Sequence, residues 1–242
     1  MSKSLGNVID PKEIIKNESA EALRLWSATE GNLSQQDISC SRERIKGELK
    51  TINKLLNIAK FISQFKKPKK ARLTALDKLF IDYIEELTSF SDSQYEIYDF
   101  YSPSIKLRHF LREIFASHYL ELIKNRAYNE EKNFSKSEQE SAHYTLHYIL
   151  ERLLILLSPI IPQITSLILE SLKAKITLFP KAKPKKSDIS LIEKIMEFNS
   201  YIWKLKKDNN LSLKSPVKDV KIPQELNPFE ADLTAAHNLE AK

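Results

Sequence analysis

The sequence predicts a mainly α-helical protein, a helical bundle followed by a small C-terminal α/β appendage. Only three glycines occur among the 242 residues, and Leu, Ile, Lys and Glu, which tolerate helix well, are abundant. Apolar residues recur at helical spacing through most of the chain. Only residues 211–214, 217–222 and 239–241 alternate as short strands do.

Two short helices are expected at the start of the chain. Asp10 can cap the first helix, and Pro11 suits its first position because proline has no amide hydrogen to lose there. The second helix is predicted over residues 17–28, with Ala22, Leu25 and Trp26 facing inward. A polar connector over residues 29–41 follows.

A long amphipathic helix is predicted over residues 41–64. Its apolar stripe is formed by Ile45, Leu49, Ile52, Leu56, Ala59 and Ile62. The opposite face is basic and carries Arg44, Lys46, Lys50, Lys54, Asn57 and Lys60. This face is either an ordinary solvated surface or a contact for a polyanion. The same two interpretations apply to the basic linker over residues 66–72 that follows.

Further helices are expected over residues 74–89, 102–128, 137–157 and 188–207, and another runs to about residue 172 after the stretch 158–164. The pattern Ser137-x-x-Glu140 is typical of a capping box. Aromatic residues between 93 and 101 are expected to pack between helices. His143 and His147 are interpreted as surface histidines and His118 as a packing histidine, because no metal-binding or nucleophilic pattern accompanies them.

Composition limits the class of protein. The 38 basic and 32 acidic residues give a net charge of +6, which suits a polyanionic partner. Cys40 is the only cysteine, so an intrachain disulfide and a cysteine zinc knuckle are excluded. The most apolar stretch, residues 153–161, is too short to span a membrane. We therefore expect a cytoplasmic protein with no membrane partner and no metal site.

The first residues carry a recognisable motif. Met1-Ser2-Lys3-Ser4 precedes Leu5-Gly6-Asn7, Asp10-Pro11 and the run Ala22-Leu23-Arg24-Leu25-Trp26. The order resembles the K-M-S-K-S loop of class I aminoacyl-tRNA synthetases and the segment that follows it. Residues 54–61 resemble the family's K-L-W-N-x-A-R-F helix, and residues 118–128 and 142–164 resemble later segments of its valine branch, in the archaeal-type arrangement.

The resemblance implies functional roles for named residues. Lys3 would be catalytic, and Ser2, Lys3 and Ser4 would contact ATP, which the full enzyme would use with Mg. The implied tRNA-binding residues are Lys50, Lys54, Asn57, Lys60, Lys124 and Arg126. The partner would be tRNA, specifically tRNA(Val), and phosphate contacts would make binding salt-dependent. No cofactor is expected on this chain alone.

The resemblance also implies three regions. Residues 1–40 would form the loop and stem-contact region, residues 41–174 the anticodon-binding bundle, and residues 175–242 a final helix with the α/β tail. Nothing in the chain resembles the H-I-G-H motif. The chain alone is therefore expected to be inactive, with the catalytic and editing part of the enzyme as a second partner. The alternatives are part of an isoleucine enzyme and a stand-alone helical module that binds RNA or protein.

Overall fold

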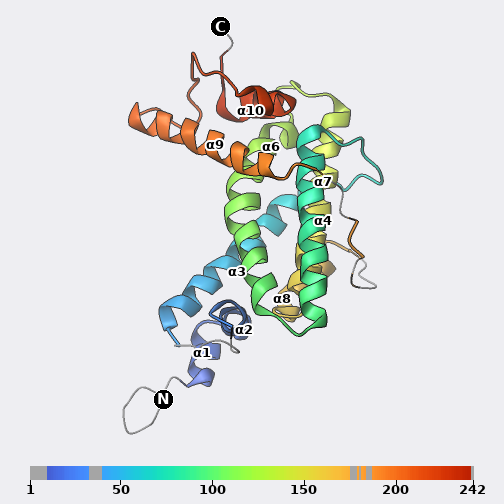
Figure 1. Cartoon of the computed structure of the whole chain (residues 1–242), viewed down its shortest axis with the longest axis vertical. Coiled ribbons are helices and arrows are strands. Elements are labelled where there is room, and N and C mark those ends of the chain that lie inside the picture. The colour runs from blue at the N-terminus through green and yellow to red at the C-terminus, as the bar shows by residue number, and fades with distance from the viewer. Residues whose placement is uncertain (1–9, 33–39, 175–178, 180, 184–186, 241–242) are drawn as a thin grey trace.

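The computed structural model describes residues 10–32, 40–174, 179, 181–183 and 187–240. Helix α1 (Pro11–Asn17) begins where expected, and its cap residue Asp10 accepts the amide hydrogen of Lys12 at 2.9 Å. Helix α2 (Ala20–Thr29) is capped by Ser19, and the apolar residues predicted to face inward are buried. These two helices lie at one end of the molecule, and the C-terminus lies at the other (Figure 1).

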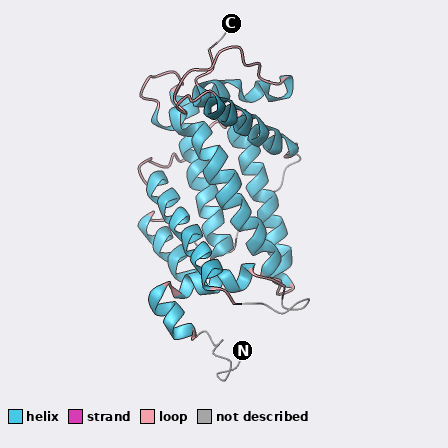
Figure 2. Ribbon diagram, turned by 90° about the vertical axis from the view of Figure 1, so that its left-hand side faces the viewer, coloured by secondary structure: helices cyan, strands magenta, loops and turns pink. Residues whose placement is uncertain are grey.

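Three long helices form most of the bundle (Figure 2), namely α3 (Arg42–Ile62), α4 (Ala75–Glu96) and α7 (Lys136–Leu157). Helix α4 runs along the length of the bundle, whereas α3 crosses it obliquely (Figure 1). The expected helix from residue 102 to 128 is present but has three parts. A π-helical segment, η2 (Phe110–Tyr119), joins α5 (Tyr101–His109) to α6 (Leu120–Tyr128). Such i→i+5 segments are rare and interrupt the regular spacing of an α-helix.

One apolar core holds these helices together. The stripe on α3 is rotated from the predicted one, because Leu55 and Ile58 are buried while Leu49 and Leu56 are only half-buried. Helix α7 contributes the largest share, with Leu146, Ile149, Leu150, Leu153 and Leu154 fully buried. Burying such side chains stabilises the fold by about 1.5–3 kcal/mol each before entropy is counted.

Helix α7 starts two residues before the predicted capping box. Ser135 and Glu138 form the box, in which Glu138 accepts the amide hydrogen of Ser135 at 2.8 Å. Ser137-x-x-Glu140 has the same pattern but lies inside the helix. Helix α8 (Pro162–Ser171) follows after a tight turn and lies near α2.

The C-terminal region differs from the prediction. Helix α9 (Ser190–Asp208), the 3-10 helix η3 (Gln224–Phe229) and α10 (Glu230–His237) cover the far end of the bundle. Over the described residues the predicted strands are reduced to one β pairing, a bridge between Val217 and Leu239, which lie in two of the predicted stretches. The buried ammonium of Lys206 donates to the carbonyls of Leu213 and His237, at 2.6 and 2.8 Å, so side-chain contacts replace a sheet here.

No helix in the described part of the chain is long and apolar enough to cross a membrane.

Candidate functional site

The basic face of α3 divides into two parts. At the N-terminal end of the helix, residues 42–46, each cation has an acidic neighbour on α1, α2 or the residues that flank them. The pairs are Arg42 with Glu13 at 2.7 Å, Arg44 with Glu30, and Lys46 with Glu18 at 3.9 Å. These three cations are therefore largely neutralised within the chain.

Lys54 points into the bundle and not into solvent. Its ammonium donates to the carbonyl of Arg112 at 3.0 Å and to the hydroxyl of Ser117 at 3.4 Å. Ser117 donates to the same carbonyl at 2.7 Å. The carbonyl of Arg112 lies in the π-helical segment, where backbone groups do not follow the regular hydrogen-bond pattern of an α-helix. The side chains of Lys54 and Ser117 supply hydrogen-bond donors to it. Lys54 therefore has a structural partner, which sequence spacing alone could not reveal.

Arg126 is buried in a network of charges. Its guanidinium forms two hydrogen bonds to the carboxylate of Asp77, at 2.7 and 2.9 Å, and one to Asp232 at 2.7 Å. It also donates to the carbonyl of Glu138 at 2.9 Å. The network joins α4, α6, α7 and α10. Because the Arg126 side chain is only 1% exposed, it has no surface with which to reach a phosphate.

One arginine with two buried carboxylates leaves an excess negative charge. Burial by itself would raise the pKa of Asp77, but Arg126, Ser141 and Tyr119 hold that pKa below its usual value. Burial raises the pKa of Asp232 to about 6, and the nearby charge of Asp77 adds to the shift. The network is thus a buried structural feature of the core. One of its carboxyl groups, that of Asp232, keeps its proton up to a higher pH than an ordinary aspartate does.

The other predicted tRNA-binding residues lie on the surface. Lys50, Asn57 and Lys60 are exposed along α3, and none of their side chains has a partner among the described residues. Lys124 on α6 is half-buried, and its ammonium lies 2.6 Å from Glu121. An exposed pair of this kind is worth little energetically and can open to another anion.

The linker after α3 adds a group of cations that the sequence interpretation had left undecided. Lys66, Lys69, Lys70 and Arg72 are exposed and have no partner among the described residues, whereas Lys67 pairs with Glu151 at 2.6 Å. Together with the last exposed lysine of α3, these residues form what we call the basic end, defined as Lys60, Lys66, Lys69, Lys70 and Arg72. The signal was visible in the sequence as five cations within seven residues.

An aromatic cluster lies beside the basic end. Tyr128, at the end of α6, is 43% exposed and has edge contacts with Phe61 and Phe65, with ring centroids 6.0 and 5.3 Å away. His143 stacks on Phe65 at 4.7 Å. The C-terminal ends of α3 and α6 therefore meet here, and one aromatic ring remains open to solvent.

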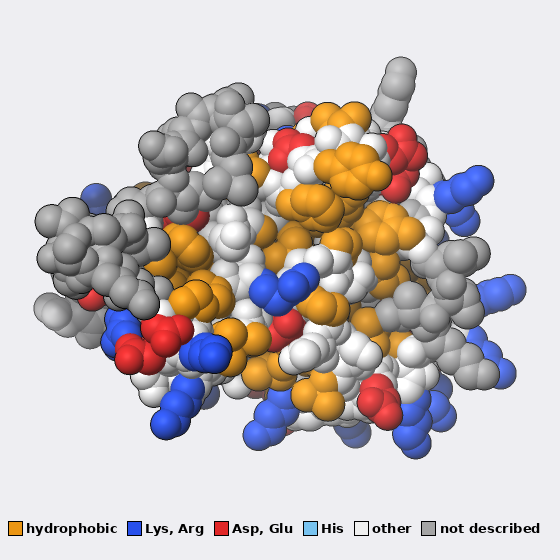
Figure 3. Space-filling model, turned by 90° about the horizontal axis from the view of Figure 1, so that it is seen from below, with side chains coloured by type: hydrophobic (Ala, Val, Ile, Leu, Met, Phe, Trp, Pro, Cys, Tyr) orange, Lys and Arg blue, Asp and Glu red, His pale blue; other side chains and the backbone are white. Residues whose placement is uncertain are grey.

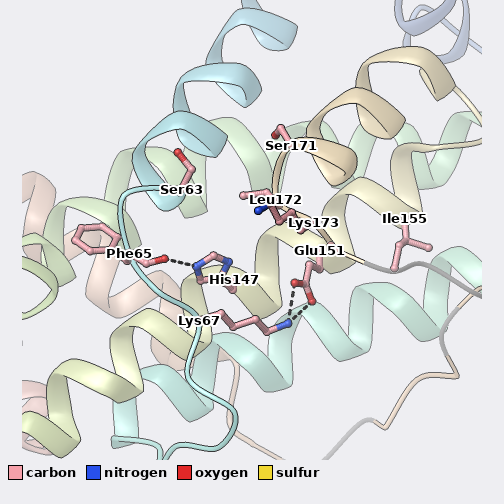
Figure 4. A pocket seen from close by; sticks show the side chains of 10 residues that line it. Ser63, Phe65, Lys67, His147, Glu151, Ile155, Ser171, Leu172 and Lys173 are labelled. Carbon is pink, nitrogen blue, oxygen red and sulfur yellow. Dashed lines mark hydrogen bonds and ion pairs between the residues drawn. The ribbon is translucent and has the colours of Figure 1, made fainter.

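A pocket of about 440 Å³ lies behind the linker (Figure 4). His147 points from α7 to the carbonyl of Phe65, with its Nε2 at 2.8 Å, and Lys67 points to Glu151. His143 contacts the carbonyl of Ala127 in the same way at 2.8 Å. The interpretation of both residues as surface histidines is corrected, because His147 is buried and His143 half-buried, and they fasten the ends of α3 and α6 to α7.

The remaining candidate residues do not form a catalytic or metal site in the described part of the chain. No group of three metal-ligating side chains occurs among the residues with described positions. His118 packs against Trp203, and its Nδ1 lies 3.2 Å from the Asn199 amide, which agrees with its interpretation as a packing residue. Ser2, Lys3 and Ser4 lie outside the described residues, so their contact with ATP stays a prediction.

Comparison with protein families agrees with this architecture. Residues 77–222 match the family described as the anticodon-binding domain of tRNA ligase, and residues 1–40 match the class I tRNA synthetases for isoleucine, leucine, methionine and valine. The chain belongs to the anticodon-binding domain family of tRNA ligases, as the resemblance predicted.

Its curated relatives include valine–tRNA ligases. The enzyme of Nanoarchaeum equitans is 34% identical over 249 residues, which cover 99% of this chain and 31% of that protein. The enzyme of Aeropyrum pernix is also 34% identical, covering 98% and 30%, and that of Rickettsia felis is 29% identical, covering 99% and 30%. The chain thus spans about a third of the length of the relatives it matches.

Proposed function

We propose that this chain is the tRNA-binding part of a valine–tRNA ligase and that it binds the anticodon arm of tRNA(Val). The observation that carries the proposal is the basic end, whose cations have no acidic partners and adjoin in sequence Phe61 and Phe65, the rings that contact the exposed Tyr128. Phosphates of the anticodon arm would lie against these cations, and an unstacked base could stack on the tyrosine ring. The likeness to valine enzymes supports the choice of tRNA.

The footprint we propose differs from the one expected from the sequence. It keeps Lys50, Asn57, Lys60 and Lys124, which are accessible, and it adds the linker cations of the basic end. It leaves out Lys54 and Arg126, because their charged groups are bound inside the protein.

Equilibrium binding tests this proposal directly. Transcripts of tRNA(Val), tRNA(Ile) and the isolated anticodon stem-loop of tRNA(Val) would be titrated with the chain at several salt concentrations. We expect the stem-loop to retain most of the salt dependence and tRNA(Val) to bind more tightly than tRNA(Ile). Equal binding of all transfer RNAs would favour a general RNA-binding module, and tighter binding of tRNA(Ile) would favour the isoleucine enzyme.

The whole enzyme would join valine to its tRNA with ATP and Mg in the cytoplasm. In that enzyme the ammonium of Lys3 would lie against phosphate oxygens, with the hydroxyls of Ser2 and Ser4 as further donors. We expect the chain alone to show no ATP–pyrophosphate exchange with valine, because it contains no segment resembling H-I-G-H. Exchange above background by the purified chain would contradict this.

A further inference from the structure

The pocket behind the linker contains polar groups whose bonding capacity the chain leaves unused. Its volume of about 440 Å³ is in the range of small-molecule sites, and its walls come from the end of α3, from α7 and from the end of α8. Ser63 and Ser171 already donate their hydroxyl hydrogens to backbone carbonyls, at 2.8 and 2.7 Å. The lining groups left to bind a ligand belong to Lys67, His147, Glu151 and Lys173.

His147 presents a bare ring nitrogen to the pocket. Its Nε2 lies 2.8 Å from the carbonyl oxygen of Phe65, and because a carbonyl can only accept, Nε2 carries the hydrogen. Burial lowers the pKa of His147, so the ring is neutral at pH 7 and Nδ1 keeps an unshared electron pair. No described group donates to Nδ1, which Figure 4 shows on the side of the ring away from Phe65. A side chain only 6% exposed thus directs a free acceptor into the cavity.

One helical turn further along α7, Glu151 pairs with Lys67. The ammonium lies 2.7 and 2.6 Å from the two carboxylate oxygens. The Lys67 and Glu151 side chains are 40% and 25% exposed, so the pair can rearrange around a ligand. A carboxylate has about four acceptor sites and an ammonium three donors, so both keep free capacity. The pair therefore offers two acceptor oxygens beside one donor.

Two acceptors beside one donor match the edge of one nucleobase. The Watson–Crick edge of guanine carries the donors N1–H and N2–H next to the acceptor O6. A carboxylate can accept both hydrogens while a neighbouring ammonium donates to O6. Adenine, cytosine and uracil each have a single donor group on this edge, so they cannot use both carboxylate oxygens and the cation together.

A further cation of the pocket suits a phosphate. Lys173 follows the end of α8, where its backbone is left-handed with a φ of 53°. Its side chain is exposed and has no partner among the described residues. Because an ammonium is a flexible point charge, it can meet a phosphate without a fixed geometry.

The pockets at the end of the molecule that carries α2 offer no such set of groups among the described residues. Figure 3 views this end, where hydrophobic side chains gather and lysine and arginine lie mostly at the margin. The two charged residues that line these pockets are engaged within the chain. Arg24 donates to the carbonyl of Ile160 at 2.6 Å, and Asp99 accepts the amide hydrogen of Tyr101 at 2.9 Å. A polar ligand therefore finds better partners in the pocket behind the linker.

We propose that the pocket behind the linker binds a guanine nucleotide, either free in solution or as an unpaired guanosine of an RNA. Glu151 accepts N1–H and N2–H, while Lys67 keeps one carboxylate oxygen and donates to O6. Nδ1 of His147 accepts the hydrogen of a ribose hydroxyl, and Lys173 meets the phosphate. The inference goes beyond the proposed function, because it requires neither tRNA(Val) nor the basic end.

Calorimetry with the whole chain tests the site. The ligands are guanosine and adenosine 5′-monophosphate (GMP and AMP), and two oligouridines that carry one central guanosine or adenosine. We expect each guanine ligand to bind at least about tenfold more tightly than its adenine counterpart. The nitrogen resonance of His147 Nδ1 should shift when GMP is added. Binding of GMP identifies the free nucleotide as a ligand, and binding of the guanosine oligomer alone identifies RNA as the source.

Two results would overturn the proposal. One is the absence of saturable binding of both guanine ligands up to about 1 mM. The other is equal affinity for the guanine and adenine ligands, because the carboxylate and the ammonium would then not be reading the base edge.

A change of specificity separates recognition from structural damage. Glu151→Gln replaces one acceptor oxygen with an amide donor, which suits xanthine because xanthine carries an oxygen in place of the guanine amino group. We expect GMP to bind at least about tenfold more weakly to this variant and xanthosine 5′-monophosphate to bind more tightly than GMP. A general loss of structure would weaken both ligands, and unchanged GMP affinity would overturn the proposal. Glu140→Gln, on the same helix but outside the pocket, is the matched control and should change neither affinity.

The site and the basic end can fail separately. Changing Lys66, Lys69, Lys70 and Arg72 to Ala should leave the affinity for GMP unchanged, since none of these residues lines the pocket. Failure of the chain to bind tRNA(Val), with selective GMP binding retained, would overturn the proposed function and leave the guanine site supported.

Discussion

The chain uses its cations in two different ways, and the bundle core and the basic end show the contrast. In the core, Arg126 and Lys54 are bound to carboxylates or backbone carbonyls of distant segments. At the basic end, Lys66, Lys69 and Lys70 are exposed with no partner among the described residues. The difference teaches that a basic residue is available to a polyanion only when the fold has not already neutralised it. Net charge does not reveal this.

Removing the core arginine should have the largest effect. Arg126→Met leaves two buried carboxylates without their cation, so we expect the free energy of unfolding to fall by about 3–5 kcal/mol. Urea titration followed by circular dichroism measures it. The double variant Arg126→Met, Asp77→Asn should recover part of the loss, because the uncompensated charge is removed. A loss below about 1 kcal/mol would show that the network is not a structural centre.

Neutralising the linker should instead change RNA binding and not stability. With Lys66, Lys69, Lys70 and Arg72 changed to Ala, we expect the slope of log affinity against log salt to decrease by roughly 3, at 0.7–0.9 for each phosphate contact. The free energy of unfolding should change by only about 0.5 kcal/mol, since the four residues are exposed.

The paired cations at the start of α3 supply the matched control for this experiment. Arg42, Arg44 and Lys46 are also basic and exposed, but each has an acidic partner. Changing these three residues to Ala should leave the salt slope nearly unchanged. If both sets of variants change the slope equally, pairing within the chain does not decide which cations meet RNA.

The pH dependence of stability should report the excess carboxylate. Asp232 has a folded-state pKa raised to about 6, so the folded protein holds a proton that the unfolded chain releases at lower pH. This group therefore lowers stability as pH rises from about 4 to 6. In Asp232→Asn that fall is absent, and the variant should gain about 2 kcal/mol relative to wild type over this range, at 1.36 kcal/mol per pH unit. Urea titrations at several pH values measure the gain, and a constant difference would contradict the assignment.

The smallest effect is expected at Lys54. Lys54→Met keeps the length of the side chain but loses the hydrogen bond to the carbonyl of Arg112, which should lower the free energy of unfolding by about 1 kcal/mol. RNA affinity and its salt slope should stay as in wild type. A reduced slope with unchanged stability would contradict this and would show that Lys54 contacts RNA. Lys60→Met provides the comparison with an exposed lysine of the same helix.

The sequence was sufficient for features that depend on neighbouring residues. The start of α1 at Pro11 and the basic character of residues 66–72 could both be read locally. The environment of Arg126 could not, because Asp77 and Asp232 are 49 and 106 residues away along the chain. Alternation over three to six residues was too weak to predict strands near the C-terminus, where the buried Lys206 ammonium binds the backbone carbonyls of Leu213 and His237.

Whether a cation in the linker is free to bind RNA also depends on the tertiary structure around it. Lys67 and Lys66 are adjacent and chemically identical, yet only Lys67 lies beside Glu151 of α7. Sequence reasoning could identify the group of cations but could not separate its members. The same holds for His147, which follows the pattern of a surface residue but points to the carbonyl of Phe65.

The π-helical segment makes the number of residues between Tyr101 and Tyr128 critical. Each residue of an α-helix turns the chain by about 100°, since 3.6 residues complete one turn. Loss of a single residue from Phe110–Tyr119 would allow a more regular helix, but it would rotate α6 and carry Arg126 away from Asp77. Insertions and deletions during evolution should therefore be excluded from this helix, even where individual side chains are free to vary.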